Sequence, residues 1–381
     1  MSDRTLRIEG PTVGDVGGRS VVLAYGNVGA EYDAIQLRAA VFDRSHRTRI
    51  RLSGARAAEM VTGLVTNDVG ALAPGHGCYA AALTSKGKIV ADVRVFVEDG
   101  SVLVDAPPRA GAAWATMVKK FVNPRIAAHT DESATLRDIG VFGATARHVV
   151  SAVSGVPAPA LEALPPYSHM AVDVGGTRIM IAHVPDLGVD GFELLVPADA
   201  FTPTWQRLVD AGGQPAGLDA WEIARVEAGR PEWGVDMDDS TIPQEANFDE
   251  LQAISYTKGC YVGQETVARI HFRGHVNRHL RGLLSSVPDA PPHGATLHDD
   301  SGTQVGDVRS SVRSPRLGGI ALGMVRREIE PGTTLFARWP APSAVSAVSA
   351  ADGATVEVVG EPAPMVQVQV GVVALPFTVA R

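Results

Sequence analysis

Residues 258–265 read KGCYVGQE, a thiol set between two glycines and close to a lysine. A cation or a helix start beside a cysteine favours its thiolate, which is the nucleophilic and metal-binding form. Gly259 and Gly263 allow the main chain to turn sharply or to approach a ligand closely. Cys260 is therefore a candidate reactive thiol. The alternative is a buried cysteine that packs as a small apolar residue on a glycine-rich bend.

Further short motifs lie on both sides of this octapeptide. They read VFDRSHR at 41–47, GLVTND at 63–68, DGFE at 190–193, RVEAG at 225–229, ETVAR at 265–269, and SPRL at 314–317 followed by Gly323. With KGCYVGQE, this ordered set resembles the YgfZ-type folate-binding proteins. They form a branch of the superfamily that also holds the glycine-cleavage T-protein, an aminomethyltransferase. The resemblance covers roughly residues 20 to 330.

The resemblance implies an α+β fold of three parts. Two interleaved α+β domains, each built from two chain segments, enclose a central folate-sized channel, and a β-barrel follows. We expect residues 1–52 with 125–215 to form the first domain, residues 53–124 with 216–275 the second, and residues 276–381 the barrel. The implied cofactor is tetrahydrofolate or a derivative.

Composition limits the class of protein. A chain of 381 residues with 45% hydrophobic and 20% charged residues can bury two or three cores. The net charge of −8 argues against a protein that coats nucleic acid, although a local basic face stays possible. Two cysteines allow at most one disulfide and fit a reducing compartment. The N-terminal residues lack an apolar run, so we expect a cytoplasmic protein without a membrane segment.

Local patterns predict helices and antiparallel strands. The helices are expected at 55–64, 111–122, 198–208 and 221–228, and the strands at 79–83, 89–97 and 101–104. Ser53 and Asp219 are candidate N-caps, the latter with Glu222 in a capping-box spacing. Short turns between the strands favour an antiparallel meander over βαβ units. After Arg269, short Val- and Leu-rich runs between turns predict an all-β domain.

Glu193 is the candidate ligand of a pterin. It begins the apolar run at 194–196, where an inward carboxylate is costly unless it binds something. A pterin presents N–H donors along its amide edge, and a carboxylate at the bottom of an apolar cleft suits them. The resemblance implies that the matching glutamate reads the pterin. The alternative is an outward residue at the start of a strand.

Asp92 is the candidate acid or base. In the T-protein, two adjacent aspartates follow a glycine-containing turn, and one of them handles the folate nitrogen during transfer. The matching residues here are Ala91 and Asp92. Loss of the first carboxylate argues against aminomethyl transfer, because a methyl group cannot exchange a proton. Strand alternation places Asp92 on the face of Arg94, opposite Ala91, and the alternative is a solvated strand residue.

The neighbours of Cys260 have expected roles of their own. Lys258 would favour the thiolate, Gln264 and Glu265 would orient it, and Tyr261 would stack on a ligand; ordinary surface is the alternative for each. The thiol itself could contact an iron–sulfur cluster shared with a partner, form a mixed disulfide, or react with a folate-borne carbon. Cys78 leads into an apolar strand and is expected to be structural.

Basic side chains gather in two places. Arg269, His271, Arg273 and His275 alternate and would share one face of a strand, where they could hold a polyglutamate tail, RNA phosphates or an acidic partner. A solvated surface is the alternative. A histidine set on a helix, at 271, 275 and 279, is disfavoured by Gly274, so no metal site is predicted.

A second cluster, Arg44, His46 and Arg47, belongs to the DRSHR segment and could line the same site. Arg225 opens the RVEAG segment and is assigned to cofactor binding with Arg269. Phosphate-cradling loops, Rossmann glycines and nucleophile elbows are absent from the sequence.

The sequence leads to three hypotheses. The first is a folate-binding accessory protein that supports assembly or repair of iron–sulfur clusters in client enzymes, with Cys260 essential. The second is a tetrahydrofolate-dependent one-carbon transferase or demethylase. The third, an RNA-binding protein, rests on the basic strand alone.

Overall fold

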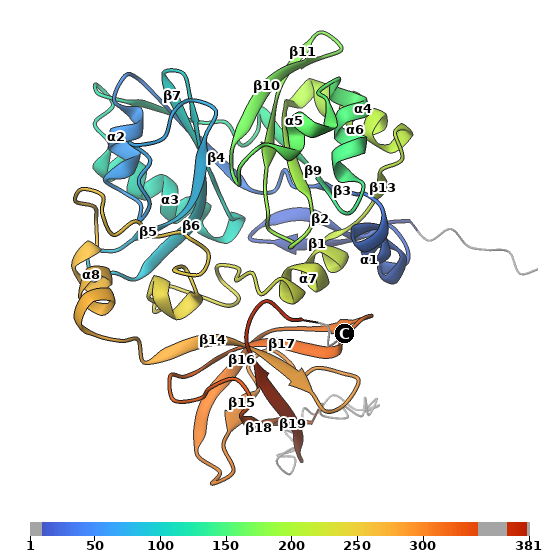
Figure 1. Cartoon of the computed structure of the whole chain (residues 1–381), viewed down its shortest axis with the longest axis vertical. Coiled ribbons are helices and arrows are strands. Elements are labelled where there is room, and N and C mark those ends of the chain that lie inside the picture. The colour runs from blue at the N-terminus through green and yellow to red at the C-terminus, as the bar shows by residue number, and fades with distance from the viewer. Residues whose placement is uncertain (1–9, 342–363, 379–381) are drawn as a thin grey trace, which may run out of the picture. The chain divides into compact units, whose positions relative to one another are not determined.

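The computed structural model describes residues 10–341 and 364–378. The backbone divides into two compact units, Met1–His279 and Leu280–Arg381 (Figure 1). The charged residues 3–9, on which the cytoplasmic prediction rests, lie outside the described residues. In the described part of the chain, no helix has the length and apolar character needed to cross a bilayer.

A six-stranded sheet of the first unit gathers segments that are far apart in sequence. Its order is β10-β11-β12-β9-β3-β13, antiparallel except for the β13–β3 pair. The strands are β3 (Ala40–Asp43), β9 (Leu136–Phe142), β10 (His169–Val174), β11 (Thr177–His183), β12 (Gly191–Pro197) and β13 (Gln214–Pro215). Three helices complete this layer: α4 (Ala146–Ser154), α5 (Ala158–Glu162) and α6 (Phe201–Asp210). Val150 and Leu208 of these helices share one apolar core with Leu194 of β12.

The chain between β3 and β9 forms a second, five-stranded sheet. Its order is β5-β6-β7-β4-β8, and every pair is antiparallel. The strands are β4 (Thr48–Ser53), β5 (Gly77–Leu83), β6 (Ile89–Glu98), β7 (Ser101–Ala106) and β8 (Ala128–Asp131). In Figure 1 this sheet lies beside the six-stranded sheet, and its core is closed by α2 (Ala57–Thr62) and α3 (Pro108–Phe121). Trp114, Met117 and Val118 supply the apolar stripe of α3, at helical spacing.

The predicted α+β meander is therefore confirmed, but both predicted caps are wrong. The N-cap of α2 is Arg56, and that of α7 (Leu218–Glu227) is Gly217; neither makes a side-chain capping bond. Ser53 closes β4 instead, because the chain makes a bend before the helix begins. Asp219 lies inside the first turn of α7, two positions after the N-cap, and so does not cap it.

Further elements complete the first unit. They are the hairpin β1 (Thr12–Val16) and β2 (Arg19–Ala24), α1 (Val28–Leu37), and α8 (Gln264–Arg273). α7 packs against both α1 and β2. Backbone pairing assigns β4 and β8 to the five-stranded sheet, while the exact domain boundaries given above stay a prediction.

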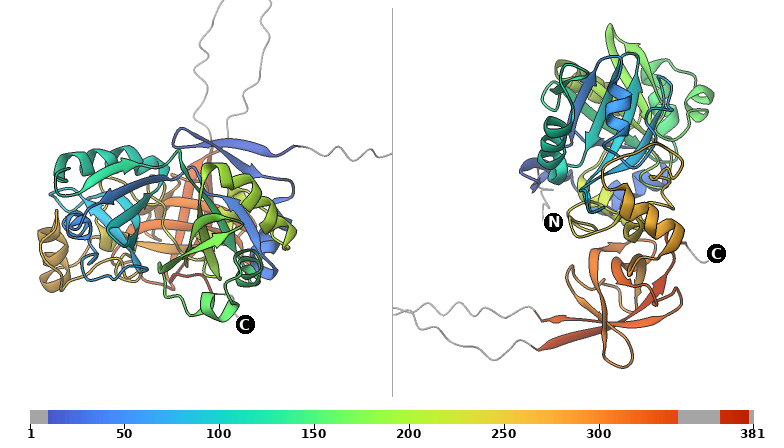
Figure 2. Two further views of the ribbon diagram at one scale, coloured as in Figure 1. Left: turned by 90° about the horizontal axis from the view of Figure 1, so that it is seen from above. Right: turned by 90° about the vertical axis from the view of Figure 1, so that its left-hand side faces the viewer.

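The second unit is a closed six-stranded barrel, as predicted. The strands follow the order β14-β17-β16-β15-β18-β19. They are β14 (Arg278–Ser285), β15 (Thr296–His298), β16 (Gln304–Ser314), β17 (Gly318–Arg326), β18 (Thr334–Pro340) and β19 (Met365–Val373). The right-hand view of Figure 2 shows them curving around one core, which contains Leu283, Leu297 and Val370. Closure leaves no unpaired sheet edge.

Candidate functional site

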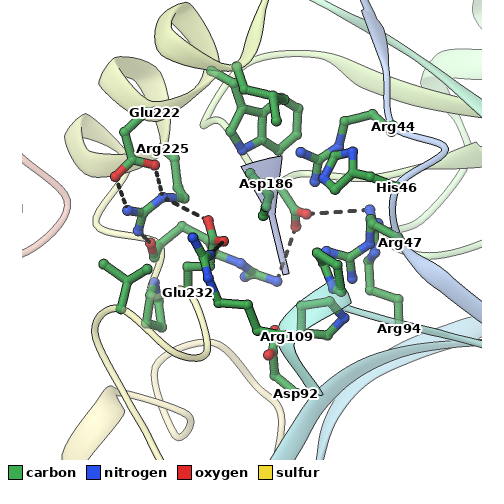
Figure 3. A pocket seen from close by; sticks show the side chains of 18 of the residues that line it. Arg44, His46, Arg47, Asp92, Arg94, Arg109, Asp186, Glu222, Arg225 and Glu232 are labelled. Carbon is green, nitrogen blue, oxygen red and sulfur yellow. Dashed lines mark hydrogen bonds and ion pairs between the residues drawn. The ribbon is translucent and has the colours of Figure 1, made fainter. Parts of the chain in front are cut away.

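A cavity of about 210 Å³ lies within the first unit (Figure 3). Residues of β5, β6, α7, the β1–β2 hairpin and several loops contribute to its wall. The polar and aromatic residues that line it are Arg44, His46, Arg47, Tyr79, Asp92, Arg94, Arg109, Asp186, Asp219, Trp221, Glu222, Arg225, Arg230 and Glu232. Charged groups thus dominate the lining, and each needs a partner or a ligand because burial of an unpaired charge is costly.

β6 aims its polar residues into this cavity. Ala91, Val93 and Val95 face the apolar core beneath the sheet, and the alternate residues Asp92 and Arg94 line the cavity. Asp92 is 7% exposed, so it is not the solvated strand residue that the sequence left open. The strand alternation predicted from the sequence is confirmed.

Asp92 retains an unused acceptor atom. The Tyr79 hydroxyl donates to Oδ2 of Asp92 at 2.9 Å, whereas Oδ1 is buried and accepts no hydrogen bond within the described part of the chain. Burial raises the pKa of Asp92, and the nearby Arg47 guanidinium offsets part of that rise. A carboxyl group in these surroundings can hold and release a proton at Oδ1.

Glu193 is buried, 1% exposed, in β12. This excludes the alternative of an outward residue. Its carboxylate lies 2.6 Å from Nη1 of Arg94 and 3.8 Å from Nε of Arg44. Both guanidiniums line the cavity, but Glu193 itself is not among the lining residues. The predicted contact of Glu193 with a pterin stays a prediction.

Asp105 of β7 joins several guanidiniums beneath the cavity. It accepts from Nε of Arg47 at 2.7 Å and from Nη2 of Arg94 at 2.5 Å, and Arg49 lies 3.6 Å away. Burial alone would raise the pKa of Asp105, but the three cations outweigh it and hold that pKa well below its usual range. Arg49 is also 3.8 Å from Asp138 of β9, so the network links the two sheets.

The opposite side of the cavity is a set of paired charges. Arg225 of α7 donates to Glu222 and, at 2.8 Å, to Asp236, and Arg109 donates to Glu232 at 2.6 Å. Figure 3 shows the Glu222–Arg225 pair across the pocket from Arg44, His46 and Arg47. Arg225 is therefore at the cavity, as a cofactor-binding role requires, with its guanidinium already engaged.

Sequence reasoning missed Arg230, Asp186 and Trp221. Arg230 stacks over Tyr79 at 4.1 Å and lies 3.1 Å from Asp186. Arg230 directly follows the RVEAG motif, which was a usable signal. Asp186 lies in a loop between strands, and nothing in its surroundings in the sequence marks it. Trp221 was assigned only to a helix, and its cavity face depends on tertiary packing.

The octapeptide stands apart from this cavity. Nζ of Lys258 donates to the carbonyls of Thr62, Val65 and Asn67 at 2.6–2.7 Å, and burial lowers its pKa to about 8. Cys260 is exposed. Neither residue is among those that line the cavity, so the catalytic roles assigned to them stay predictions.

The remaining octapeptide side chains shape the start of α8. Oε1 of Gln264 accepts from the backbone N–H of Tyr261 at 3.1 Å, and Glu265 lies in the first turn. The ring of Tyr261 is 4.7 Å from Nζ of Lys258. Cys78 packs against the core of the five-stranded sheet, where burial raises its pKa to about 12, in keeping with the predicted structural role.

The predicted basic strand is wrong, because residues 264–273 form α8. A helix does not bring alternate residues to one face, and His271 instead stacks on Tyr256 at 3.6 Å between ring centroids. Arg269 and Arg273, four positions apart, border a separate groove with Lys88 and His275. α8 ends before His275, so the three histidines do not share a helix. In the described ranges, no cluster of three metal-ligating side chains occurs.

Of the predicted catalytic and cofactor-binding residues, the structure brings two to the cavity, Asp92 and Arg225, and the predicted basic cluster of Arg44, His46 and Arg47 also lines it. Glu193 does not line the cavity, but it contacts Arg94, which does. The other predicted residues are elsewhere on the first unit: Lys258, Cys260, Tyr261, Gln264, Glu265 and Arg269.

Each of the two units matches a known protein-family domain. Residues 3–255 match the GCVT N-terminal domain, and residues 278–377 match the glycine cleavage T-protein C-terminal barrel domain. The aminomethyltransferase of Saccharopolyspora erythraea is 31% identical over 338 residues, which are 86% of this chain and 89% of that protein. The aminomethyltransferase of Thermosynechococcus vestitus is 34% identical over 307 residues, 80% and 81% of the two chains.

The fold agrees with a solved structure. The glycine cleavage system aminomethyltransferase T from Bartonella henselae superimposes with a TM-score of 0.78 at 20% identity, covering 97% of this chain and 94% of that one. This likeness supports the α+β architecture and its barrel.

The leading hypothesis from the sequence, an accessory protein for iron–sulfur cluster assembly or repair, is wrong. The curated relatives that cover most of the chain carry the name aminomethyltransferase, and none of these comparisons points to iron–sulfur clients.

The domain matches and the relatives agree over nearly the whole described chain, from the two-sheet unit through the barrel. This chain belongs to the glycine cleavage T-protein family, whose members here are the aminomethyltransferases.

Proposed function

We propose that the protein is a tetrahydrofolate-dependent one-carbon transferase or demethylase. The observation that carries this proposal is Asp92, a buried carboxyl group with a free oxygen in the cavity of a T-protein fold. Family membership supports the reaction class, and the donor of the one-carbon unit is left open by it.

The aromatic and acidic side chains of the cavity suit a folate. Trp221 and Tyr79 both line it, so flat rings have aromatic neighbours there. Oδ1 of Asp92 can exchange a proton with a ligand nitrogen. Tetrahydrofolate, when bound, supplies the nitrogen that accepts the one-carbon unit. One carboxyl group at this nitrogen is available despite Ala91, because Asp92 is the one that faces the cavity.

Within the family, we assign the chain to the YgfZ-type branch on the octapeptide and its companion motifs. The roles predicted for Cys260, Lys258, Tyr261, Gln264, Glu265 and Arg269 are kept as proposals with that assignment. Substituting Cys260 with serine in the assay below tests the most important of them. An RNA partner has no support once the basic strand is replaced by a helix.

The test is formation of methylene-tetrahydrofolate from a panel of methylamine donors. Wild-type protein is expected to turn over at least one donor, and Asp92→Asn to lower kcat by about 10²–10⁴ because it cannot exchange the proton. Asp99→Asn, at an exposed turn after β6, is the matched control and should match wild type. Failure across the panel, or full activity of Asp92→Asn, would contradict the proposal.

A further inference from the structure

Arg44 is the least compensated cation of the cavity. It is 5% exposed, yet its Nε has no hydrogen-bond partner among the residues that the structure describes. Its nearest carboxylate, Glu193, is 3.8 Å away and is engaged more closely by Arg94. Burial lowers the pKa of Arg44 to about 10, and Glu193 reverses only part of this effect. The guanidinium still carries its charge at neutral pH.

Arg44 is nevertheless held in place. Its guanidinium carbon lies 3.6 Å above the ring of Trp221, and its backbone N–H donates to the carbonyl of Asp138 at 3.0 Å. Phe42 and Phe142 pack edge-on against Trp221, with ring centroids 5.4 and 4.9 Å away. A buried cation that is fixed but not neutralised is preorganised for an anion.

Cations and carboxyl groups both surround Arg44. Arg47 and Arg94 are its cationic neighbours and lower its pKa, whereas the carboxyl groups of Glu193 and Asp138 raise it. Burial, and then Glu193, raise the pKa of Asp138 well above its usual range, which weakens Asp138 as a counter-charge. His46, beside Arg44 and Arg47, stays neutral because burial and these cations lower its pKa.

We infer that Arg44 and Arg47 form a carboxylate subsite of the cavity. Both line it, from the loop between β3 and β4, and Arg47 uses Nε on Asp105. A guanidinium binds a carboxylate through two parallel N–H donors, which makes carboxylate the fitting anion for a small site. Neutral His46 adds a ring nitrogen to the same wall.

This subsite deepens the proposed function and rests on it. A one-carbon transferase holds two molecules that can bring a carboxylate: an N-methyl amino acid donor, or the folate through its glutamate. The chemistry of the subsite is the same for both sources, and binding measurements with matched pairs of ligands separate them.

The experiment is isothermal titration calorimetry with two such pairs. Tetrahydrofolate is compared with tetrahydropteroate, which lacks the glutamate, and N-methylglycine with N-methylethylamine, which lacks the carboxylate. In at least one pair, wild type should bind the carboxylate member about tenfold or more tightly, since a charged hydrogen-bonded pair is lost in its partner. A difference in the first pair assigns the subsite to folate, and one in the second pair assigns it to the donor.

Arg44→Gln should abolish that preference and leave binding of the carboxylate-free member unchanged. Arg137→Gln is the matched control, because Arg137 also stacks on an aromatic ring, Phe201 at 5.0 Å, and lies 3.4 Å from Asp43, away from the cavity. Arg44→Lys, which keeps the charge, replaces Arg44→Gln if the latter does not fold, and should keep only part of the preference.

The inference is overturned if neither pair shows a preference, or if the preference survives in Arg44→Gln. These titrations need no turnover, so failure of the proposed reaction is seen separately. Loss of product formation with an intact, Arg44-dependent preference would contradict the proposed function and leave the subsite in place.

Discussion

The β6 wall of the cavity and the octapeptide at 258–265 contain similar groups in opposite surroundings. Asp92 and Arg94 on β6 are buried, and Asp92 has an oxygen without a partner. In the octapeptide, the ammonium of Lys258 is occupied by three carbonyls, and the thiol of Cys260 is exposed. Whether a side chain can take part in chemistry depends on its burial and on its unused hydrogen-bonding atoms. A distinctive sequence motif does not reveal either property.

The largest expected effect comes from disrupting the buried charges beside the cavity. Arg94→Met should lower the free energy of unfolding by about 3–5 kcal/mol, because Glu193 would lose its close cationic partner and Asp105 one of its guanidiniums, while both charges stay buried. Arg51→Met removes half-buried pairs with Glu98 and Glu132 outside the cavity and should lose about 1 kcal/mol. Urea titrations measure the free energy of unfolding of both variants. Equal losses would show that the buried network contributes no more to stability than the half-buried pairs.

The octapeptide side is tested by Lys258→Met. Three carbonyls would lose their donor, so we expect a loss of about 2–3 kcal/mol in the free energy of unfolding. Lys88→Met, which removes one bond to the carbonyl of Ser240 at an exposed turn, should lose a few tenths of a kcal/mol. A loss for Lys258→Met no larger than the control's would mean that these bonds do not fix the segment.

The effect of burial can also be tested outside both regions, through the pH dependence of stability that His169 causes. Burial lowers the pKa of His169 from 6.5 to about 4. Above pH 6.5 neither state binds the proton; below it the unfolded chain does, and the folded chain does not until about pH 4. Stability therefore falls with decreasing pH, by about 2 kcal/mol between pH 7 and 5. His169→Leu should remove that part of the decrease, and an identical pH profile of its unfolding free energy would contradict the assignment.

The smallest expected effect is that of Lys258 on thiol reactivity. Iodoacetamide should modify exposed Cys260 at least about a hundredfold faster than Cys78, whose thiol is held protonated by burial. Lys258→Met should change the Cys260 rate by less than about twofold, because its ammonium is engaged by carbonyls. Mass spectrometry of the native protein follows both sites. A strong slowing in Lys258→Met would restore the activating role predicted from the sequence.

Sequence reasoning reached the fold because its signals are local or family-wide. Alternation along β6, the turns of the meander and the Val-rich C-terminal runs depend on period and on turn residues. The site was harder to predict. Arg44, Arg94 and Asp186 are far apart in sequence, and they come together only when the two sheets of the first unit have formed. The alternating basic residues at 269–275 and Gly274 predict a strand, whereas Gly274 is the C-cap at which α8 ends.

The kcat of Asp92→Asn, measured beside Cys260→Ser in the methylene-tetrahydrofolate assay, tests the central claim most directly. The account predicts that Asp92→Asn lowers kcat by about 10²–10⁴, and by more than Cys260→Ser does, because Asp92 is the buried carboxyl group with a free oxygen in the cavity. Full activity of Asp92→Asn together with an inactive Cys260→Ser would move the chemistry to the octapeptide and contradict the account.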